Sequence, residues 1–525
     1  MALALPRFAV FQSTVRQKNY LRYTHEDGGL HGLLQFSGEE IVSPYSKFEI
    51  VRANSPTAAG NDNGFVHIRC CYNNKYWVAN SSSNNSFIIA GADEPNEDQS
   101  QWSCTLFEPI LVDGEGGSSS SSRSSSSTST STSTSTVHVR FRHVKLGHYL
   151  RSLMTRDHYH ACVSTSYDRR YYIDDHMNHV ISLMFMSLVS RMRDHYHACP
   201  YVRPTAPARL DVFGIIDWES LLILPKYIAL KGDNGLYLSA QRNDRHQYLQ
   251  FASSDIGDQT VGNEMFITKD GSVRIKNNHF GKFWRRSPNW IWADSDDTTT
   301  NNLDTLFYPV KVGDNVIALR NLGNKNFCNS HRNYLKAAVT TLSRETRLVV
   351  EELVISREIY NVNFRLLDAR IYNQKIITMV TKTATNNTQV SNITTLKLIR
   401  KETRSTTWKG SVSLKLGVKT NIQTGIPLVV DGKVELVTEF TRNYEWGETV
   451  STEIEVETEY TITVPPMSKV TVSLLATQGS CNIPYSYTQR DTLMNGRSVI
   501  HDFDDGVYTG INSFNFFYKT KEEKL

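Results

Sequence analysis

The sequence lacks a long hydrophobic run, a strong net charge and a regular cysteine pattern. Nowhere do about 18 apolar residues follow one another, as a membrane-spanning helix requires. The net charge is only +4, and no basic cluster with interleaved aromatics indicates nucleic-acid binding. Of the 7 cysteines, only Cys70 and Cys71 lie close together. Because the first residues do not resemble a secretory signal, we expect reduced thiols and a cytoplasmic or nucleocytoplasmic location.

Motifs that would indicate an enzyme are also missing. The chain has no Gly-rich phosphate loop, no Gly-x-Ser-x-Gly elbow, no His-Glu-x-x-His and no Cys-x-x-Cys. Asp502, Asp504 and Asp505 form an acidic group, but the spacing of a calcium-binding loop does not surround them. We therefore expect no enzymatic activity, no cofactor and no bound metal.

Two stretches cannot contribute to a core. Residues 116–136 are almost entirely Ser and Thr, which predicts a loop. The segment RDHYHAC occurs at residues 156–162 and again, letter for letter, at 193–199. Its side chains could donate zinc ligands from two arms: His158, His160, Cys162, His195, His197 and Cys199. The spacing matches no established zinc site, and an accidental duplication within an insert at 156–204 is the other interpretation.

Short β-type runs separated by Gly, Asn, Asp and Ser dominate the rest, and amphipathic helices are scarce, which predicts an all-β protein. Internal repeats refine this prediction. Aromatic turn motifs recur three times in each of two regions, at 18–22, 74–78 and 146–151, and at 232–238, 278–284 and 323–327. Three similar four-stranded units bury their apolar faces only against one another, so we predict two tandem β-trefoils.

A third region shows a period-two alternation of apolar and polar residues on either side of residues 425–432. Each arm has about a dozen residues, and about 9–11 suffice for a tilted strand to cross a bilayer. Residues 425–432 (GIPLVVDG) are interpreted as an apolar tip between glycines that permit the reversal. The apolar positions of this predicted membrane-inserting hairpin are Val412, Leu414, Leu416, Val418, Ile422, Ile426, Leu428, Val430, Val434, Leu436 and Phe440. The alternation is equally typical of a half-buried hairpin in a β-sandwich, and that interpretation stays open.

Residues 8–355 resemble the amaranthin-type agglutinin domains of plant lectins. The resemblance lies in segments 19–23, 32–36, 93–95, 102–107, 144–149, 216–218 and 282–284. It implies two trefoils that bind galactose- or GalNAc-type glycans where the first trefoil of one protomer meets the second trefoil of another. The implied sugar-binding residues are Asn84, Asn85, Ser86 and Phe87 in the first trefoil, and Asn289, Trp290 and Trp292 in the second. An ordinary alternative is that Trp290 or Trp292 belongs to the core.

From about residue 351 the chain resembles the aerolysin-type pore-forming module. Segments 408–410, 424–427, 432–435, 444–447, 464–467, 470–476, 487–493 and 505–510 carry this resemblance. It implies an elongated β module whose hairpin becomes part of a transmembrane barrel, with Lys415, Lys419, Lys433, Glu435 and Glu439 lining the lumen. The predicted domains are a first trefoil at 1–215, a second at 216–355 and an aerolysin-like pore-forming domain at 356–525.

Together these features predict a lectin that carries a pore-forming module to glycan-bearing membranes. The expected partners are glycans of glycoproteins or glycolipids, further copies of the chain in a homo-oligomer, and a target membrane after assembly. The resemblance implies a role in plant defence or stress. A nucleocytoplasmic stress lectin whose last third only oligomerises is the main alternative, and an actin-bundling scaffold is a weaker one.

Overall fold

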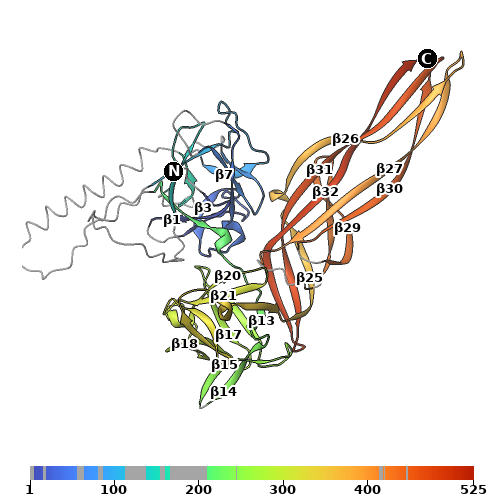
Figure 1. Ribbon diagram of the computed structural model, residues 1–525. Helices are drawn as coiled ribbons and strands as arrows, with labels where there is room; N and C mark the ends of the chain where they lie inside the picture. The colour runs from blue at the N-terminus through green and yellow to red at the C-terminus, as the bar shows by residue number, and fades with distance from the viewer. Residues whose placement is uncertain are drawn as a thin grey trace, which may run out of the picture. The chain divides into compact units, whose positions relative to one another are not determined.

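The computed structural model describes residues 5–15, 19–55, 64–80, 87–112, 137–153, 160–165, 210–243, 245–412, 418, 420–444 and 447–525. These residues form an all-β structure without an α-helix (Figure 1). Chain contacts define two compact units, one made of Met1–Cys71 and Lys75–Glu219, the other of Tyr72–Asn74 and Ser220–Leu525. The predicted loop 116–136 and zinc candidates His158, His195, His197 and Cys199 lie outside the described residues.

The first unit is built from short antiparallel strands around an aromatic core. Trp77 lies at its centre, with the rings of Phe11, Phe48 and Phe107 packed around it at centroid distances of 5.2–6.0 Å. Cys162, one of the zinc candidates, is fully buried in a small apolar cluster with Leu33. The elements are β1 Phe8–Ser13, β2 Tyr20–Tyr23, β3 Leu34–Gly38, η1 Pro44–Ser46, β4 Phe48–Arg52, β5 Val66–Cys70, β6 Tyr76–Ala79, β7 Ile88–Ala92, β8 Phe107–Leu111, β9 Val137–His143, β10 Arg151–Ser152, β11 Val163–Ser164, β12 Phe213–Asp217 and η2 Trp218–Ser220.

The second unit begins with twelve strands whose pairing pattern repeats three times. Each repeat has four strands. The first strand pairs with the second, the second and third form a hairpin, and the fourth pairs with the first. Pairing of β24 with β13 closes the set. The elements are β13 Tyr227–Lys231, β14 Tyr237–Asn243, β15 His246–Ser253, β16 Asn263–Ile267, β17 Val273–Asn277, β18 Lys282–Ser287, β19 Trp290–Ser295, η3 Leu303–Thr305, β20 Phe307–Lys311, β21 Val316–Asn321, β22 Phe327–His331, β23 Tyr334–Val339, η4 Arg344–Thr346 and β24 Leu348–Glu352.

The last strands of the second unit are much longer and form an extended, twisted sheet that ends at the C-terminus (Figure 1). The strand order is β29-β28-β25-β31-β32-β27-β30, and β26 pairs with β31. A core of Ile359, Trp408, Tyr485 and Tyr508 fills one end of it. The elements are β25 Val354–Phe364, η5 Leu366–Asp368, β26 Arg370–Asn386, β27 Asn392–Lys409, β28 Thr420–Val430, β29 Lys433–Tyr444, β30 Thr449–Val464, β31 Ser468–Leu493 and β32 Ser498–Lys524.

Within the described residues, no helix has the length and apolar character needed to span a membrane. In the same part of the chain, no group of three or more His, Cys, Asp or Glu side chains is arranged to hold a metal ion.

One buried histidine makes the first unit sensitive to acid. His143 ends β9 and is 0% exposed, and burial lowers its pKa to about 4. In the unfolded chain the imidazole takes up its proton near pH 6.5, so the unfolded state binds the proton first. The stability of the unit should therefore be highest above pH 6.5 and fall by about 1.4 kcal/mol per pH unit toward pH 4. Hydrogen exchange in residues 137–153 at pH 7.5 and 4.5 measures this loss.

Asn321 indicates a suitable replacement for His143. Asn321 ends β21 opposite Phe307, just as His143 ends β9 opposite Phe107. Asn321 is also fully buried and cannot titrate in this range. His143→Asn should remove most of the extra acid sensitivity of residues 137–153. Parallel acid destabilisation of the variant and the wild type would show that His143 is not responsible.

Candidate functional site

The predicted hairpin exists, but its turn is shorter and more polar than expected. β28 and β29 pair in register from Thr420 opposite Tyr444 to Val430 opposite Lys433. The chain reverses at Asp431 and Gly432, with φ values of 48° and 75°. Two consecutive positive φ values are typical of a two-residue type I′ turn, for which Asp-Gly is a favoured sequence. The prediction of an apolar tip at 425–432 is therefore wrong, because the apolar residues before the turn belong to strand β28.

Part of the first predicted arm cannot be compared with the structure. Leu414 and Leu416 lie outside the described residues, and so does the side chain of Phe440. Val412 is described and 49% exposed, whereas Val418 is half-buried against the apolar cluster that contains Leu353 and Leu493. Strand β28 begins only at Thr420.

The buried face of β28 changes side partway along the strand. Ile422 is 0% exposed, but beyond it the buried residues are Pro427 and Val429, the latter at 1%. The register shifts between Gly425 and Pro427, where one residue of β28 stands opposite two residues of β29, as in a β-bulge, and the buried face changes at this irregularity. The prediction placed Ile426, Leu428 and Val430 in an apolar tip that would face lipid. In the docked hairpin these three residues lie in strand β28 and are half-buried.

On strand β29, the two described apolar positions of the prediction differ from each other. Val434 packs partly against the core around Trp408, whereas Leu436 is 52% exposed. Lys433 and Glu435, which alternate with them, are exposed to water. At the start of β29 the predicted alternation of buried and exposed side chains is therefore seen at Val434 but not at Leu436.

A single asparagine of the sheet holds the end of β28 in place. The Asn512 side chain of β32 accepts a hydrogen bond from the Val429 backbone N–H at 3.0 Å and donates one to the Val429 carbonyl at 2.9 Å. The Tyr508 hydroxyl donates to the Pro427 carbonyl at 3.1 Å. The sequence analysis did not single out Asn512, Tyr508 or Val429. Pro427 was the available signal, since proline within a strand commonly marks a bulge.

A second set of hydrogen bonds fixes the chain where it leaves β27. The Asp505 carboxylate accepts a hydrogen bond from the Ser411 backbone N–H at 2.9 Å and another from the Ser411 hydroxyl. The Tyr487 hydroxyl donates to the same carboxylate at 3.0 Å. Burial, together with the negative charge of Asp505, raises the pKa of Tyr487 well above its usual value, so the phenol remains a donor. Asp505 therefore has a structural role at the root of the hairpin.

The hairpin joins two long strands that are themselves paired along their whole length. β27 and β30 run antiparallel from Asn392 opposite Val464 to Thr407 opposite Thr449. Cross-strand ion pairs such as Lys397 with Glu457, at 2.7 Å, lie on their exposed face. In contrast, among the described residues β28 pairs with the rest of the sheet through three parallel partners of β25, Arg357–Ile359.

The predicted sugar-binding loop of the first unit is only partly described. Asn84, Asn85 and Ser86 lie outside the described residues. Phe87 is 4% exposed and packs with Leu33 and Cys162. A buried ring offers no free face for a sugar, so Phe87 is corrected from a sugar-contacting residue to a core residue.

The predicted residues of the second unit lie on the β18–β19 hairpin, and their arrangement settles one open question. Trp290 and Trp292 are both half-buried, whereas Ile291 between them is 0% exposed. Residues two apart on a strand point to the same side, so the core residue is Ile291 and the alternative that one tryptophan is core is wrong. Asn289 lies in the exposed turn just before them, and its carbonyl accepts a hydrogen bond from the Ala337 N–H at 2.7 Å.

The two tryptophans belong to a surface group of rings that we call the aromatic cluster, made of Tyr248, Trp290, Trp292 and Tyr334 from three neighbouring hairpins. Tyr248 lies 6.0 Å from Trp290, 5.9 Å from Trp292 and 5.4 Å from Tyr334 between ring centroids. Asn243 donates a hydrogen bond to the Tyr334 hydroxyl at 2.8 Å. Ring faces beside fixed amides and hydroxyls are what a saccharide site requires, because a sugar presents C–H patches and hydroxyls together.

Two family models match the chain in adjoining regions. The model of the Agglutinin domain matches residues 3–118 and 222–362, and the model described as Clostridium epsilon toxin ETX/Bacillus mosquitocidal toxin MTX2 matches residues 345–509. The chain combines agglutinin domains with an aerolysin-like toxin domain. The aromatic cluster therefore belongs to the second agglutinin region, and the hairpin of β28 and β29 belongs to the toxin domain. Lectin and pore-forming toxin families of this kind are generally non-enzymatic.

Known structures with some similarity include three that cover between 32% and 58% of the chain. A lamprey immune protein is 12% identical, with 58% of this chain and 93% of that chain covered and a TM-score of 0.29. An aerolysin-like protein of Bombina maxima is 14% identical, with coverages of 32% and 99% and a TM-score of 0.22. The parasporin-2 toxin of Bacillus thuringiensis is 19% identical, with coverages of 32% and 74% and a TM-score of 0.21. No curated protein matches the chain.

Loss of the Asn512 side chain should loosen the hairpin of the toxin domain. In Asn512→Ala the Val429 N–H and carbonyl lose their partners in a buried site, at a cost of about 1–3 kcal/mol. Hydrogen exchange at the amides of β28 should then be about 5- to 100-fold faster than in the wild type. Asn515→Gly is the control, because Asn515 is an exposed residue of the same strand with a φ of 52°, which glycine adopts readily. Equal exchange in Asn512→Ala and the wild type would contradict the role of Asn512.

Proposed function

We propose that this protein binds galactose- or GalNAc-type glycans through its agglutinin domains and forms β-barrel pores with its toxin domain after it has assembled on a glycan-bearing membrane. The observation that carries the proposal is the attachment of the hairpin. It is an amphipathic ribbon between two long paired strands, held in the sheet by one short parallel pairing and by the side chains of Asn512 and Tyr508. Such a ribbon can leave the sheet while β27 and β30 stay paired.

The energetics favour release onto a membrane over release into water. Ile422 and Val429 would each lose about 1.5–3 kcal/mol of burial if the hairpin entered water. In a closed barrel with its apolar face toward lipid, Ile422 remains out of water and the backbone groups pair with neighbouring copies, whereas Val429 has the other parity and turns toward the lumen. A monomer cannot satisfy its open strand edges in lipid, so insertion requires a homo-oligomer. The barrel also requires the bulge at Gly425 and Pro427 to rearrange, because all predicted lipid-facing residues share one parity.

For the lectin part, we propose two tandem β-trefoils, at residues 1–215 and 216–355, with the toxin domain at 356–525. The threefold repeat of strand pairing from β13 to β24 supports this for the second region. Asn289, Trp290 and Trp292 are the proposed glycan contacts there, and Asn84, Asn85 and Ser86 remain the candidates of the first trefoil.

We further propose a cytoplasmic or nucleocytoplasmic protein of plant defence, without enzymatic activity, that becomes membrane-associated when activated. A stress lectin whose toxin domain only oligomerises is the second candidate.

An engineered disulfide that holds the hairpin in the sheet, and that reductant can open, tests pore formation. Ile359 of β25 and Ile422 of β28 are register partners in neighbouring strands, so a cysteine pair at these positions lies within reach of a disulfide. Cys481, buried in the same core, is replaced by alanine in every variant. On vesicles that carry GalNAc-terminated glycolipid, the oxidised pair should bind but release no dye, and reductant should restore release.

Two controls make the disulfide experiment interpretable. The single variant Ile422→Cys should release dye with or without reductant, and vesicles without glycolipid should not leak with any variant. Dye release by the oxidised pair at the rate of the single variant would contradict hairpin insertion. No leakage by any variant on vesicles that it binds would favour the lectin that only oligomerises.

The aromatic cluster should dominate glycan binding by the second trefoil. Trp290→Ala removes a stacking face and should weaken binding of a GalNAc-terminated glycan about tenfold, measured by titration calorimetry. Trp292→Ala should weaken it less, because the ring of His246 already stacks on Trp292 at 4.1 Å between centroids. Trp102→Ala is the matched control, since Trp102 is 52% exposed and lies outside the aromatic cluster. If the three variants bind the glycan as the wild type does, the aromatic cluster is not the glycan site.

A further inference from the structure

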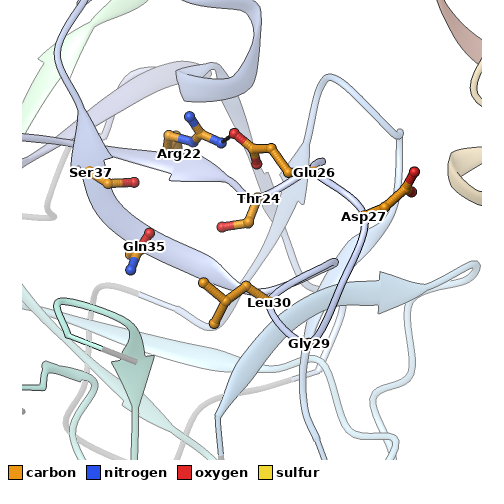
Figure 2. Close-up of a pocket in the computed structure, with 8 residues that line it drawn as sticks. All are labelled: Arg22, Thr24, Glu26, Asp27, Gly29, Leu30, Gln35 and Ser37. Atoms are coloured by element: carbon orange, nitrogen blue, oxygen red, sulfur yellow. Dashed lines mark hydrogen bonds and ion pairs between the residues drawn. The ribbon is translucent and has the colours of Figure 1, made fainter. Parts of the chain in front are cut away.

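A cavity of about 410 Å³ opens at the β2–β3 hairpin of the first agglutinin domain (Figure 2). This volume lies within the range of about 300–1,000 Å³ that is usual for small-molecule sites. Neither the resemblance nor the aromatic cluster accounts for this cavity. The lining side chains that matter here are Arg22, Thr24, Glu26, Leu30, Gln35 and Ser37.

The backbone of the hairpin fixes the polar side of this cavity. Arg22 of β2 is the register partner of Gln35 of β3, so both side chains lie on the same face of the hairpin. Thr24 lies two residues after Arg22 and Ser37 two residues after Gln35, so in this antiparallel hairpin they flank the Arg22–Gln35 pair at opposite ends. Their hydroxyls point inward, toward the cavity between them (Figure 2). The Thr24 N–H donates to the Leu33 carbonyl at 2.9 Å, which holds the threonine in place. The cavity is therefore preformed by strand pairing.

Two polar atoms of the cavity lack a hydrogen-bond partner among the described residues. Thr24 is only 5% exposed, yet its hydroxyl is buried and unpaired, and the Arg22 Nε is also buried and unpaired. An unsatisfied buried polar group costs about 1–3 kcal/mol. A ligand that presents a hydroxyl here can donate to one atom and accept from the other, because a hydroxyl does both.

The charges of the cavity select against an anion. Arg22 forms an ion pair with Glu26, so its positive charge is already balanced. Burial alone would raise the pKa of Glu26, but the hydrogen bond from Arg22 lowers it below its usual value, so the carboxylate stays ionised at neutral pH. Asp27 at the rim adds a further negative charge, although its side chain points away from the cavity (Figure 2). A sugar carboxylate or a phosphate would therefore meet no free positive charge.

From this geometry we propose that the cavity at the β2–β3 hairpin binds a neutral monosaccharide unit of a glycan, separately from the aromatic cluster. Hydroxyls of the sugar bond the Thr24 and Ser37 hydroxyls, the Arg22 Nε and the Glu26 carboxylate. A C–H patch of the ring rests on Leu30, which supplies the apolar side of the cavity. The assignment rests on the proposed glycan binding and gives the first agglutinin domain a site of its own.

The test uses the full chain with Trp290→Ala and Trp292→Ala, so that glycan binding by the aromatic cluster is removed. The probes are methyl galactoside and methyl N-acetylgalactosaminide, with N-acetylneuraminic acid and inorganic phosphate as anionic probes, in ligand-observed NMR titrations. The neutral glycosides should still bind in this background. Adding Thr24→Val should weaken that binding about tenfold, whereas Thr24→Ser, which keeps the hydroxyl, should change it less than about twofold.

A stability measurement separates binding from folding. Because the Thr24 hydroxyl has no hydrogen-bond partner in the part of the chain that the structure describes, Thr24→Val should not lower the thermal midpoint of unfolding. If that variant does not fold, Ser37→Ala takes its place, with the same expected loss of binding. Unchanged glycoside binding in these variants would overturn the proposal, and so would binding of the anionic probes in preference to the neutral ones. Loss of all binding in the tryptophan background would overturn the cavity site alone, whereas a wild type that binds no glycan would overturn the proposed lectin function.

Discussion

The packing of strand β28 onto the end of the toxin sheet is the constraint on which the structure depends. Ile422 and Val429 enter a core formed by Trp408, Tyr485 and Tyr508, and the side chain of Asn512 pairs with both backbone groups of Val429. This arrangement keeps an amphipathic ribbon in a water-compatible form. The neighbouring strands β31 and β32, by contrast, pair from Ser468 opposite Lys524 to Thr492 opposite Ser498. The sheet is therefore held by continuous pairing, whereas the ribbon is held by a few separable contacts.

The all-β class, the agglutinin and toxin regions and the hairpin between two long strands could be predicted from the sequence, because alternation and motif spacing are local properties. The position of the turn was also readable, since Asp431-Gly432 is a strong type I′ signal, but the apolar residues before it were interpreted as part of the tip. Pro427 was a local signal for an irregularity there, but the change of buried face could not be predicted, because it depends on the register with β29 and on contacts with β32.

The same distinction applies to the agglutinin domains. Trp290 and Trp292 were found as candidate contacts from their residue types, but their partners Tyr248 and Tyr334 come from other hairpins, and only the fold brings these rings together. The cavity at Arg22 and Gln35 depends on the pairing register of β2 and β3, which short strands do not specify in sequence. Phe87 shows the opposite case: a plausible ring for stacking is a core residue, because its burial depends on Leu33 and Cys162.

The central claim is that, after assembly, every second residue of the β28–β29 hairpin faces lipid. Environment-sensitive fluorophores attached at single cysteines at positions 433, 434, 435 and 436 measure this directly on glycolipid-bearing vesicles. The account predicts blue-shifted emission for probes at Val434 and Leu436 and water-like emission at Lys433 and Glu435, with no such alternation on vesicles that lack the glycolipid. Emission at Leu436 that stays water-like on vesicles bound by the protein would contradict the account.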